Sequence, residues 1–361
     1  MKNIIYRGAI NSLSFGNVSY NLLRELYRKE YQVAIFPFGT SLNFESFNSI
    51  DPDFQKWIVS MSQNRFHLAK KDIPTLSQWH LSGSENTISK NNTLLTFYEL
   101  DQPTLIEKSI AELQDHCVFS SKHSYERFKD IGCENINHVS IGFDEDFHVT
   151  DKTYLEGVAH FGIIGKFEKR KNTAQIIKNW ANKYGNNYDY QLSCCVNNPF
   201  FKEEDMNNLI AQTLGGKSYG NINFLPRLKT NSEVNEFMNS VDIDLSGLSG
   251  AEGWNIPSFN STALGKWSVV MDHTAHKDWA NSKNSILIKP DNLEPIYDNI
   301  FFKPDQPFNQ GNFNTISDET MIKCFEKSEK FIGKKNTEGL KLQSKFTYNK
   351  TLNKLLKIIE K

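Results

Sequence analysis

The chain has 361 residues, which at roughly 150 residues per domain predicts two domains with a cleft between them. Lysine and arginine total 41 against 42 for aspartate and glutamate, so the charge balance excludes a strongly basic coat for binding nucleic acid. No window approaches the roughly 20 apolar residues of a membrane span, and the N-terminus lacks a signal-like apolar stretch, so we expect a cytoplasmic protein.

Short β-branched or aromatic runs alternate with longer amphipathic stretches along the first half. This pattern is typical of βα units on parallel sheets, so we predict an α/β fold. Helices are expected over residues 18–30 and 103–113. Strands are expected at residues 3–9, 31–38, 93–98, 116–121 and 136–142.

A polar, acidic stretch over residues 143–156 interrupts this pattern before a second series begins. We therefore predict two doubly wound, Rossmann-like domains, residues 1–150 and 151–335. Strands of the second series are expected at residues 158–165, 190–196, 221–225, 241–248, 267–272 and 285–290.

The C-terminal segment, residues 331–361, carries eight lysines against two glutamates. It also carries an apolar stripe at helical spacing, formed by Leu352, Leu355, Leu356 and Ile359. We predict a terminal helix over residues 336–361, docked on the body with its lysine face in solvent. The alternative is a basic surface that holds an anionic acceptor or lipid headgroups, and so a peripheral membrane contact.

The five cysteines are odd in number, widely spaced and never form a C-x-x-C pair. This argues against a disulfide scaffold and against a zinc knuckle. We expect all of them to be structural thiols: Cys117, Cys133, Cys194, Cys195 and Cys324.

The most informative stretch, residues 248–270, is expected to fold as strand, loop, helix and strand. Pro257 suits a first helical turn because its missing N–H is not needed there, and Gly265 suits the position just past a helix end. The helix N-terminus leaves free backbone N–H groups that, with the helix dipole, favour a phosphate. Glu252 can accept hydrogen bonds from sugar hydroxyls, and Gly253 lets the backbone approach a ligand closely.

A second candidate site follows the strand that ends at Gly165. Four cations come within six residues of it: Lys166, Lys169, Arg170 and Lys171. We predict Asn172 as the N-cap of the next helix, with Gln175 completing a capping box. Because open α/β sheets bind ligands at their carboxyl edge, we predict that this loop binds an anion.

Together the two loops resemble the donor site of GT-B glycosyltransferases, specifically glycosyltransferase family 4. That family's signature is similar to P-S-x-x-E-G-F-G-L-P-x-x-E-A-x-A-x-G, and Trp254 replaces its Phe. Its spacing is kept by Ser249, Glu252, Gly253, Ile256, Pro257, Ala263 and Gly265. The upstream motif G-R-x-x-x-x-K is matched by Gly165, Lys166 and Lys171.

The resemblance extends to the first half of the chain. Residues 14–26, SFGNVSYNLLREL, resemble the glycine loop and first helix of these enzymes, and residues 96–104 contain a similar aromatic-Glu-Leu-Asp motif. His80 is a candidate for the histidine that many relatives place near the sugar, the alternative being a packed polar residue. The fold implied is GT-B: two Rossmann-like domains that face a cleft, with the C-terminal helix crossing back to the first domain.

The resemblance also implies roles for single residues. Lys166 and Lys171 would neutralise the donor diphosphate and, with Glu252, make up the catalytic set. Glu252 and the following backbone would hold the transferred sugar, while position 260 would bind the ribose. The implied donor-binding residues are Gly16, Asn17, Gly165, Gly253, Trp254, Asn255, Ile256 and Asn260.

Two residues depart from the family pattern. Asn260 stands where the family has the second Glu of an E-x7-E pair, and an amide makes a weaker hydrogen bond to a ribose diol than a carboxylate does. Lys166 stands in place of an Arg, which keeps the charge but loses the bidentate fork.

The predicted function is transfer of a sugar from a nucleotide-diphosphate sugar to a hydroxyl acceptor, with retention of configuration, no metal and no other cofactor. The acceptor stays open among a glycan, a lipid-linked sugar, a protein and a modified nucleic-acid base. Alternatives are a degenerate sugar-nucleotide-binding scaffold and an epimerase of the same fold. A nicotinamide dehydrogenase is disfavoured because SFGNVS lacks the G-x-G-x-x-G spacing.

Overall fold

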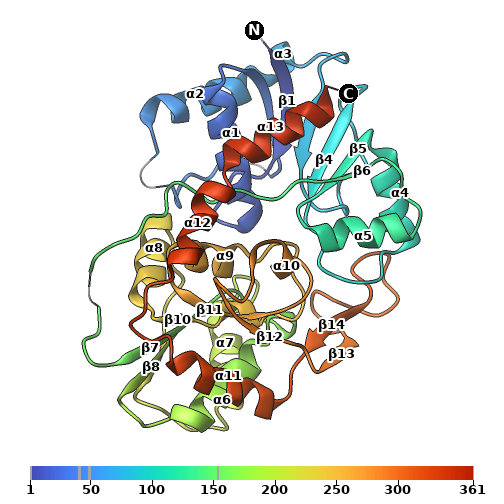
Figure 1. Cartoon of the computed structure of the whole chain (residues 1–361). Coiled ribbons are helices and arrows are strands. Elements are labelled where there is room, and N and C mark those ends of the chain that lie inside the picture. Colours follow the sequence, from blue (N-terminus) through green and yellow to red (C-terminus); the bar gives the residue numbers. More distant parts are fainter. Residues whose placement is uncertain (1, 40–41, 48–49, 153, 361) are drawn as a thin grey trace.

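The structure, a computed structural model, describes residues 2–39, 42–47, 50–152 and 154–360. Two parallel six-stranded sheets form its two halves, and the chain ends in a helix that returns to the first half (Figure 1). Lys361 of the expected basic C-terminus and Thr153 of the expected boundary stretch lie outside the described residues.

The first sheet is parallel throughout, as the alternating pattern predicts. In spatial order it runs β2 (Gln32–Pro37), β1 (Asn3–Gly8), β3 (Thr75–Gln78), β4 (Asn92–Thr96), β5 (His116–Phe119) and β6 (Ile136–His138). The helices of this half are α1 (Ser14–Arg28), α2 (Pro52–Gln63), α3 (Arg65–Leu68), α4 (Leu105–Leu113) and α5 (Lys122–Asp130).

The second sheet is also parallel. In spatial order it runs β12 (Ile286–Ile288), β11 (Trp267–Met271), β10 (Ile243–Asp244), β7 (Ala159–Ile164), β8 (Tyr190–Cys195) and β9 (Ile222–Phe224). Read from β9, this is the Rossmann order 3-2-1-4-5-6. The helices of this half are α6 (Thr173–Tyr184), α7 (Glu203–Thr213), α8 (Asn231–Ser240), α9 (Ile256–Ala263), α10 (His276–Trp279) and α11 (Asp318–Glu329).

The expected strands all fall on strands of the two sheets, and the differences lie in their lengths. The run expected at 241–248 is only the short β10, followed by a 3-10 turn, η2 (Ser246–Leu248). The strand β3 has no counterpart among the expected strands. All five cysteines are buried and free, as expected.

The expected capping box at Asn172 is wrong. Asn172 precedes α6 but lies in the left-handed region, with φ 54°, and its side chain caps nothing. Its amide instead donates to the carbonyl of Leu248 at 2.8 Å, while Gln175 donates to the carbonyl of Ile316 at 2.8 Å. Both side chains therefore bond to residues outside α6 and do not cap its N-terminus.

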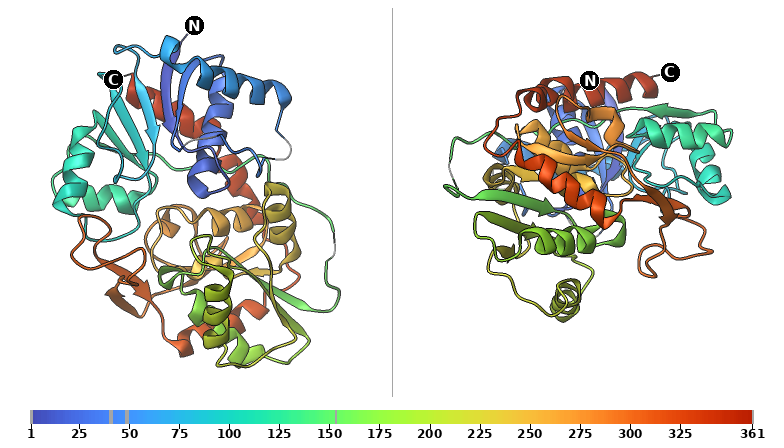
Figure 2. Two further views of the ribbon diagram at one scale, coloured as in Figure 1. Left: turned by 180° about the vertical axis from the view of Figure 1, so that it is seen from behind. Right: turned by 60° about the horizontal axis from the view of Figure 1, so that its bottom comes forward.

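An excursion between β12 and α11, residues 291–316, is not anticipated by the sequence pattern, and we call it the strap. It contains an antiparallel hairpin, β13 (Asn292–Pro295) and β14 (Asn312–Thr315), and reaches from the second half to the first (Figure 2). The backbone N–H of Asn312 donates to Asp101 at 2.7 Å, and that of Asn309 donates to Glu107 at 2.9 Å. Three buried strap side chains, Ile296, Phe302 and Phe313, join an apolar cluster of the first half.

The single terminal helix expected over residues 336–361 is wrong. Two helices, α12 (Thr337–Lys345) and α13 (Tyr348–Ile359), are separated where Phe346 has an extended backbone and Thr347 caps α13. They cross from the second half back to the first, where α13 packs against α1 (Figure 1). The expected apolar stripe of α13 is buried, and lysines such as Lys354 and Lys357 remain exposed. The crossing runs beside the connection that follows β6, where Phe143 N–H donates to the Phe346 carbonyl at 2.9 Å. Two chain segments therefore join the halves side by side.

This junction predicts that Gly142→Ala destabilises the protein. A Cβ at Gly142 would lie 2.3 Å from the backbone nitrogen of Tyr348, where only backbone can give way. We expect a loss of about 2 kcal/mol in urea unfolding, because overpacking a tight contact costs this much. Lys354→Ala, on the exposed face of α13, should change stability by less than about 0.5 kcal/mol. Equal stabilities of the two variants would contradict the close crossing.

Candidate functional site

The ends of neighbouring strands place the two predicted motifs side by side. In the second sheet, β7 and β10 are neighbours whose following loops diverge, and such switch points form crevices in open α/β sheets. The motif of residues 165–171 follows β7, and that of residues 249–256 follows β10. In the first sheet β1 and β3 form a similar switch point, so that loops from both halves meet.

A cavity of about 410 Å³ lies where these loops face one another, and we call it the interdomain cavity. Ten of the expected site residues line it: Asn17, Gly165, Lys166, Lys171, Glu252, Gly253, Trp254, Asn255, Ile256 and Asn260. Gly16 does not line it. Gly16 lies in the first turn of α1, so close to Asn11 that a Cβ would be 2.1 Å from its carbonyl oxygen.

Glu252 is the charged centre of this cavity. Its Oε1 lies 2.7 Å from Lys171 Nζ, and its Oε2 lies 3.2 Å from a guanidinium nitrogen of Arg170. Arg170 also pairs with Glu168 at 3.3 Å, and Glu168 pairs with Lys166. Five side chains of alternating charge thus run from one predicted phosphate-binding lysine to the other.

These pairs fix the ionisation of the carboxylates. Burial by itself would raise the pKa of the Glu252 carboxyl, but Lys171 and Arg170 outweigh burial and hold this pKa well below its usual range. Burial would likewise raise the pKa of Glu168, and Arg170 with both lysines lowers it instead. Both carboxylates are therefore ionised at neutral pH.

The loop that carries Glu252 is supported from behind. Thr274 Oγ1 accepts from the backbone N–H of Glu252 at 3.3 Å, and Ala275 N–H donates to the Glu252 carbonyl at 3.3 Å. The indole N–H of Trp279 donates to the carbonyl of Trp254 at 3.1 Å. Residues 274–279 therefore hold the shape of the loop that carries Glu252.

Two expected donor-binding residues have structural side chains. Trp254 is buried against Phe259 and Phe346, so it meets the cavity through its main chain. Asn255 lies in the left-handed region with φ 62° and caps α9, since its Oδ1 accepts from Ser258 N–H. Its amide also donates to Nε2 of His276 at 2.9 Å, which fits the other ring nitrogen donating to a carbonyl.

The N-terminus of α9 forms one wall of the cavity. Ile256 and Pro257 begin this helix and line the cavity. The N–H of Ile256 is the one left without a partner within the helix, because Pro257 has no N–H and the N–H of Ser258 donates to Asn255 Oδ1. Gly265 ends the helix with φ 85°, as expected. Asn260, one turn along α9, is 3% exposed and lines the same cavity. This wall suits an anion at the helix start and a polar group beside Asn260.

Gly253 lies where the two halves are in direct contact. Its carbonyl accepts from Ser120 Oγ of the first half at 2.8 Å. A Cβ here would lie 2.9 Å from the Cβ of Phe97 and 3.2 Å from the backbone nitrogen of Tyr98. Glycine is therefore required by contact between the halves, in addition to any approach by a ligand.

The first half contributes residues that the sequence left undecided or did not indicate. His80 faces the cavity beside Phe15, with ring centroids 4.3 Å apart. His80 is exposed to solvent, but partial desolvation by neighbouring groups and then the charge of Lys166 lower its pKa, so its ring is neutral at pH 7. Glu99 also lines the cavity, and desolvation raises its pKa despite the nearby Arg170. Only the motif of residues 96–104 gave a signal for it.

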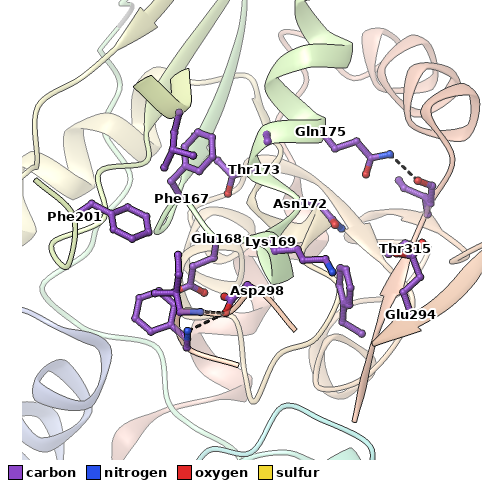
Figure 3. Close-up of a pocket in the computed structure, with 16 residues that line it drawn as sticks. Phe167, Glu168, Lys169, Asn172, Thr173, Gln175, Phe201, Glu294, Asp298 and Thr315 are labelled. Carbon is purple, nitrogen blue, oxygen red and sulfur yellow. Dashed lines mark hydrogen bonds between the residues drawn. The ribbon is translucent and has the colours of Figure 1, made fainter. Parts of the chain in front are cut away.

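A second cavity of about 480 Å³ lies against the strap (Figure 3). Its polar side chains already bond to protein groups: Lys169 to two strap carbonyls, Asp298 to three backbone N–H groups, and Glu294 to Thr315. The predicted motifs converge elsewhere. We therefore place the functional site in the interdomain cavity, although it is the smaller of the two.

Within the described ranges, no three His, Cys, Asp or Glu side chains gather as a metal site. No helix in the same ranges is both long and apolar enough to cross a bilayer.

Comparison with known proteins supports the architecture. No protein-family model and no curated protein matches the chain. Among solved structures, sucrose-phosphate synthase from Thermosynechococcus elongatus superposes with a TM-score of 0.71 at 10% identity, covering 100% of this chain and 98% of that one. HepE from Anabaena, in complex with UDP and glucose, gives 0.65 at 12% identity with 100% of both chains covered. The lipopolysaccharide outer core galactosyltransferase WaaB gives 0.62 at 13% identity, with 99% of each covered. These neighbours are GT-B glycosyltransferases, and the chain has the GT-B fold.

Proposed function

We propose that this protein is a glycosyltransferase that moves a sugar from a nucleotide-diphosphate sugar to a hydroxyl acceptor. One observation carries the proposal: Lys166, Lys171, Glu252 and the start of α9 converge on one cavity at the switch points of both sheets. The complex of the structural neighbour HepE with UDP and glucose supports a nucleotide sugar as donor.

The chemistry requires departure of a nucleoside diphosphate, so the main task is to stabilise negative charge on the leaving group. Lys166, Lys171 and the positive end of the α9 dipole, with the N–H of Ile256, would supply fixed positive charge at the diphosphate. These groups support a mechanism without a metal. We further propose retention of configuration, in which the acceptor attacks from the leaving-group side and the departing phosphate takes the acceptor's proton.

The domain roles follow from the same arrangement. Residues 1–150 would form the acceptor side and residues 151–335 the donor side, with residues 336–361 packing back on the first domain. The acceptor remains a glycan, a lipid-linked sugar, a protein or a modified base. Because the apolar face of α13 is buried, contact with an anionic acceptor or lipid surface would use its exposed lysines. We expect the protein to act in the cytoplasm.

The first prediction concerns donor binding. A panel of UDP-, GDP-, ADP- and dTDP-sugars, tested by calorimetry and by release of nucleoside diphosphate, should give one binder with slow hydrolysis. Lys171→Ala and Glu252→Gln should each weaken it at least about tenfold, because each removes a charge-assisted contact. The matched control is Lys178→Ala, which removes an exposed lysine on α6. This variant should bind the donor as the wild type does.

A folded wild type that binds no member of the panel would favour the degenerate scaffold. Recovery of an epimerised sugar, in place of hydrolysed or transferred sugar, would favour the epimerase.

A second prediction concerns Asn260. Asn260→Asp restores a carboxylate of the same shape, and we expect about fivefold tighter binding of the donor nucleotide, because a charged acceptor strengthens a hydrogen bond to a ribose hydroxyl. If residue 260 bonds to the 2′-hydroxyl, the gain in affinity should vanish for the 2′-deoxynucleotide. If it bonds to the 3′-hydroxyl, the gain should vanish for the 3′-deoxynucleotide. An equal gain for all three would place Asn260 away from the ribose.

A third prediction concerns metal dependence. Because the chain's own cations would balance the diphosphate, the initial rate should change by less than about twofold in excess EDTA. A loss of activity that Mg²⁺ or Mn²⁺ restores would show that the cations of this cavity are not sufficient.

A further inference from the structure

Arg170 is a charged residue in the cavity wall that the proposed donor contacts do not use. It lies between the two lysines of the predicted phosphate motif, yet its side chain is buried with only 8% exposed. It contacts Glu252, Glu168 and the carbonyl of Ala251, all of them protein groups. Because the charge of Arg170 is directed at protein groups, we expect its function to lie in the structure of the loop itself.

We infer that Arg170 is a positioning residue that keeps Glu252 ionised and oriented when Lys171 leaves it for the donor diphosphate. This inference rests on the proposed function. Glu252 pairs with two cations, Lys171 at 2.7 Å and Arg170 at 3.2 Å. Lys171 cannot bind a diphosphate at full strength while it is held by the carboxylate.

The cost of releasing Lys171 depends on Arg170. Glu252 is 6% exposed, and a buried carboxylate without a cationic partner is strongly destabilised. With Arg170 in place, the carboxylate keeps one ion pair after Lys171 departs. Without Arg170, either Lys171 stays with Glu252 and the donor binds weakly, or Glu252 takes up a proton as the donor binds.

Arg170 and Lys171 differ in how firmly the protein holds their side chains. This difference is what the proposal requires, because Arg170 must stay with Glu252 while Lys171 moves to the donor. Arg170 is held by Glu168 and the Ala251 carbonyl, and its own carbonyl accepts from Gly250 N–H at 2.7 Å. Lys171 has 16% of its side chain exposed, and its stem passes over Gly165, where a Cβ would lie 3.2 Å from Lys171 Cδ. The arginine is fixed by the protein, while the lysine reaches the cavity.

Other charged or titratable groups share this environment and must be considered in any pH dependence. They lie on the loop after β7, on the segment that follows β4, on the loop before α10 and at the first residue of α10. They are Lys166, Glu168, Glu99, His273 and His276.

The test uses the full-length protein and three probes in turn: UDP-glucose, GDP-mannose and ADP-glucose, whose diphosphate does not titrate near neutral pH. For Arg170→Met, we expect about tenfold weaker binding than wild type at about pH 8. The affinity should recover as the pH falls to about 6, because the bound state of this variant favours a protonated Glu252. Calorimetry in buffers of different ionisation enthalpy should detect this proton uptake.

Matched variants separate positioning from packing. Lys178→Met removes an exposed lysine of α6 that pairs with Asp318 and does not line the interdomain cavity, so this variant should bind as the wild type does. Arg170→Lys should restore most of the affinity and abolish the proton uptake. In a Glu252→Gln background, Arg170→Met should have almost no further effect, since the charge that Arg170 serves is gone.

The outcomes distinguish the two proposals. If the wild type binds none of the three probes and no sugar of the wider panel, the proposed function fails. If the wild type binds but Arg170→Met causes the same pH-independent loss in the wild-type and the Glu252→Gln backgrounds, only the role of Arg170 fails. Should Arg170→Met not fold, carboxyl ¹³C spectra of the wild type decide: Glu252 ionised with and without donor supports the role, and a protonated Glu252 in the complex overturns it.

Discussion

A carboxylate buried at the meeting point of two loops must be paired with cations, and this requirement organises the site. Glu252 on the loop after β10 meets Lys171 and Arg170, which come 81 and 82 positions earlier in the chain. Their attraction joins the loop after β7 to the loop after β10 across the switch point of the second sheet. Gly253 and the start of α9 directly follow Glu252 in the chain. The position of the Glu252 loop therefore sets both the contact of Gly253 with the first half and the place where α9 begins.

Much of the fold could be predicted from periodicity because parallel strands buried on both faces are continuous apolar runs. This is why β7, β8 and β11 were predicted within a residue or so of their observed bounds. Strand β3 was missed because three of the four residues in its sequence, TLSQ, are polar. The strap was missed because its strands, NLEP and NFNT, are polar or interrupted by proline, and its apolar residues pack against the other half of the chain.

Prediction of the site depended on spacing within each motif and could not reach contacts between motifs. Glu252, Lys166 and Lys171 are set by local sequence, and the structure brings them to one cavity. Arg170 was predicted, with the other three cations of its loop, to bind an anion. Its burial could not be predicted, because that burial depends on Glu168 and Glu252 together. Likewise, nothing in the local sequence shows that the side chains of Trp254 and Asn255 turn inward, because their partners come from α9, α10 and the connection between α12 and α13.

The strap bears on how the chain acquires this structure during synthesis. Residues 3–138, which supply every strand of the first sheet, leave the ribosome well before Ile296, Phe302 and Phe313, yet these three complete one of its apolar clusters. Helix α13, which covers α1, emerges last of all. The nascent first half therefore carries unfilled apolar surface until translation is almost finished, and its final packing awaits the end of the chain.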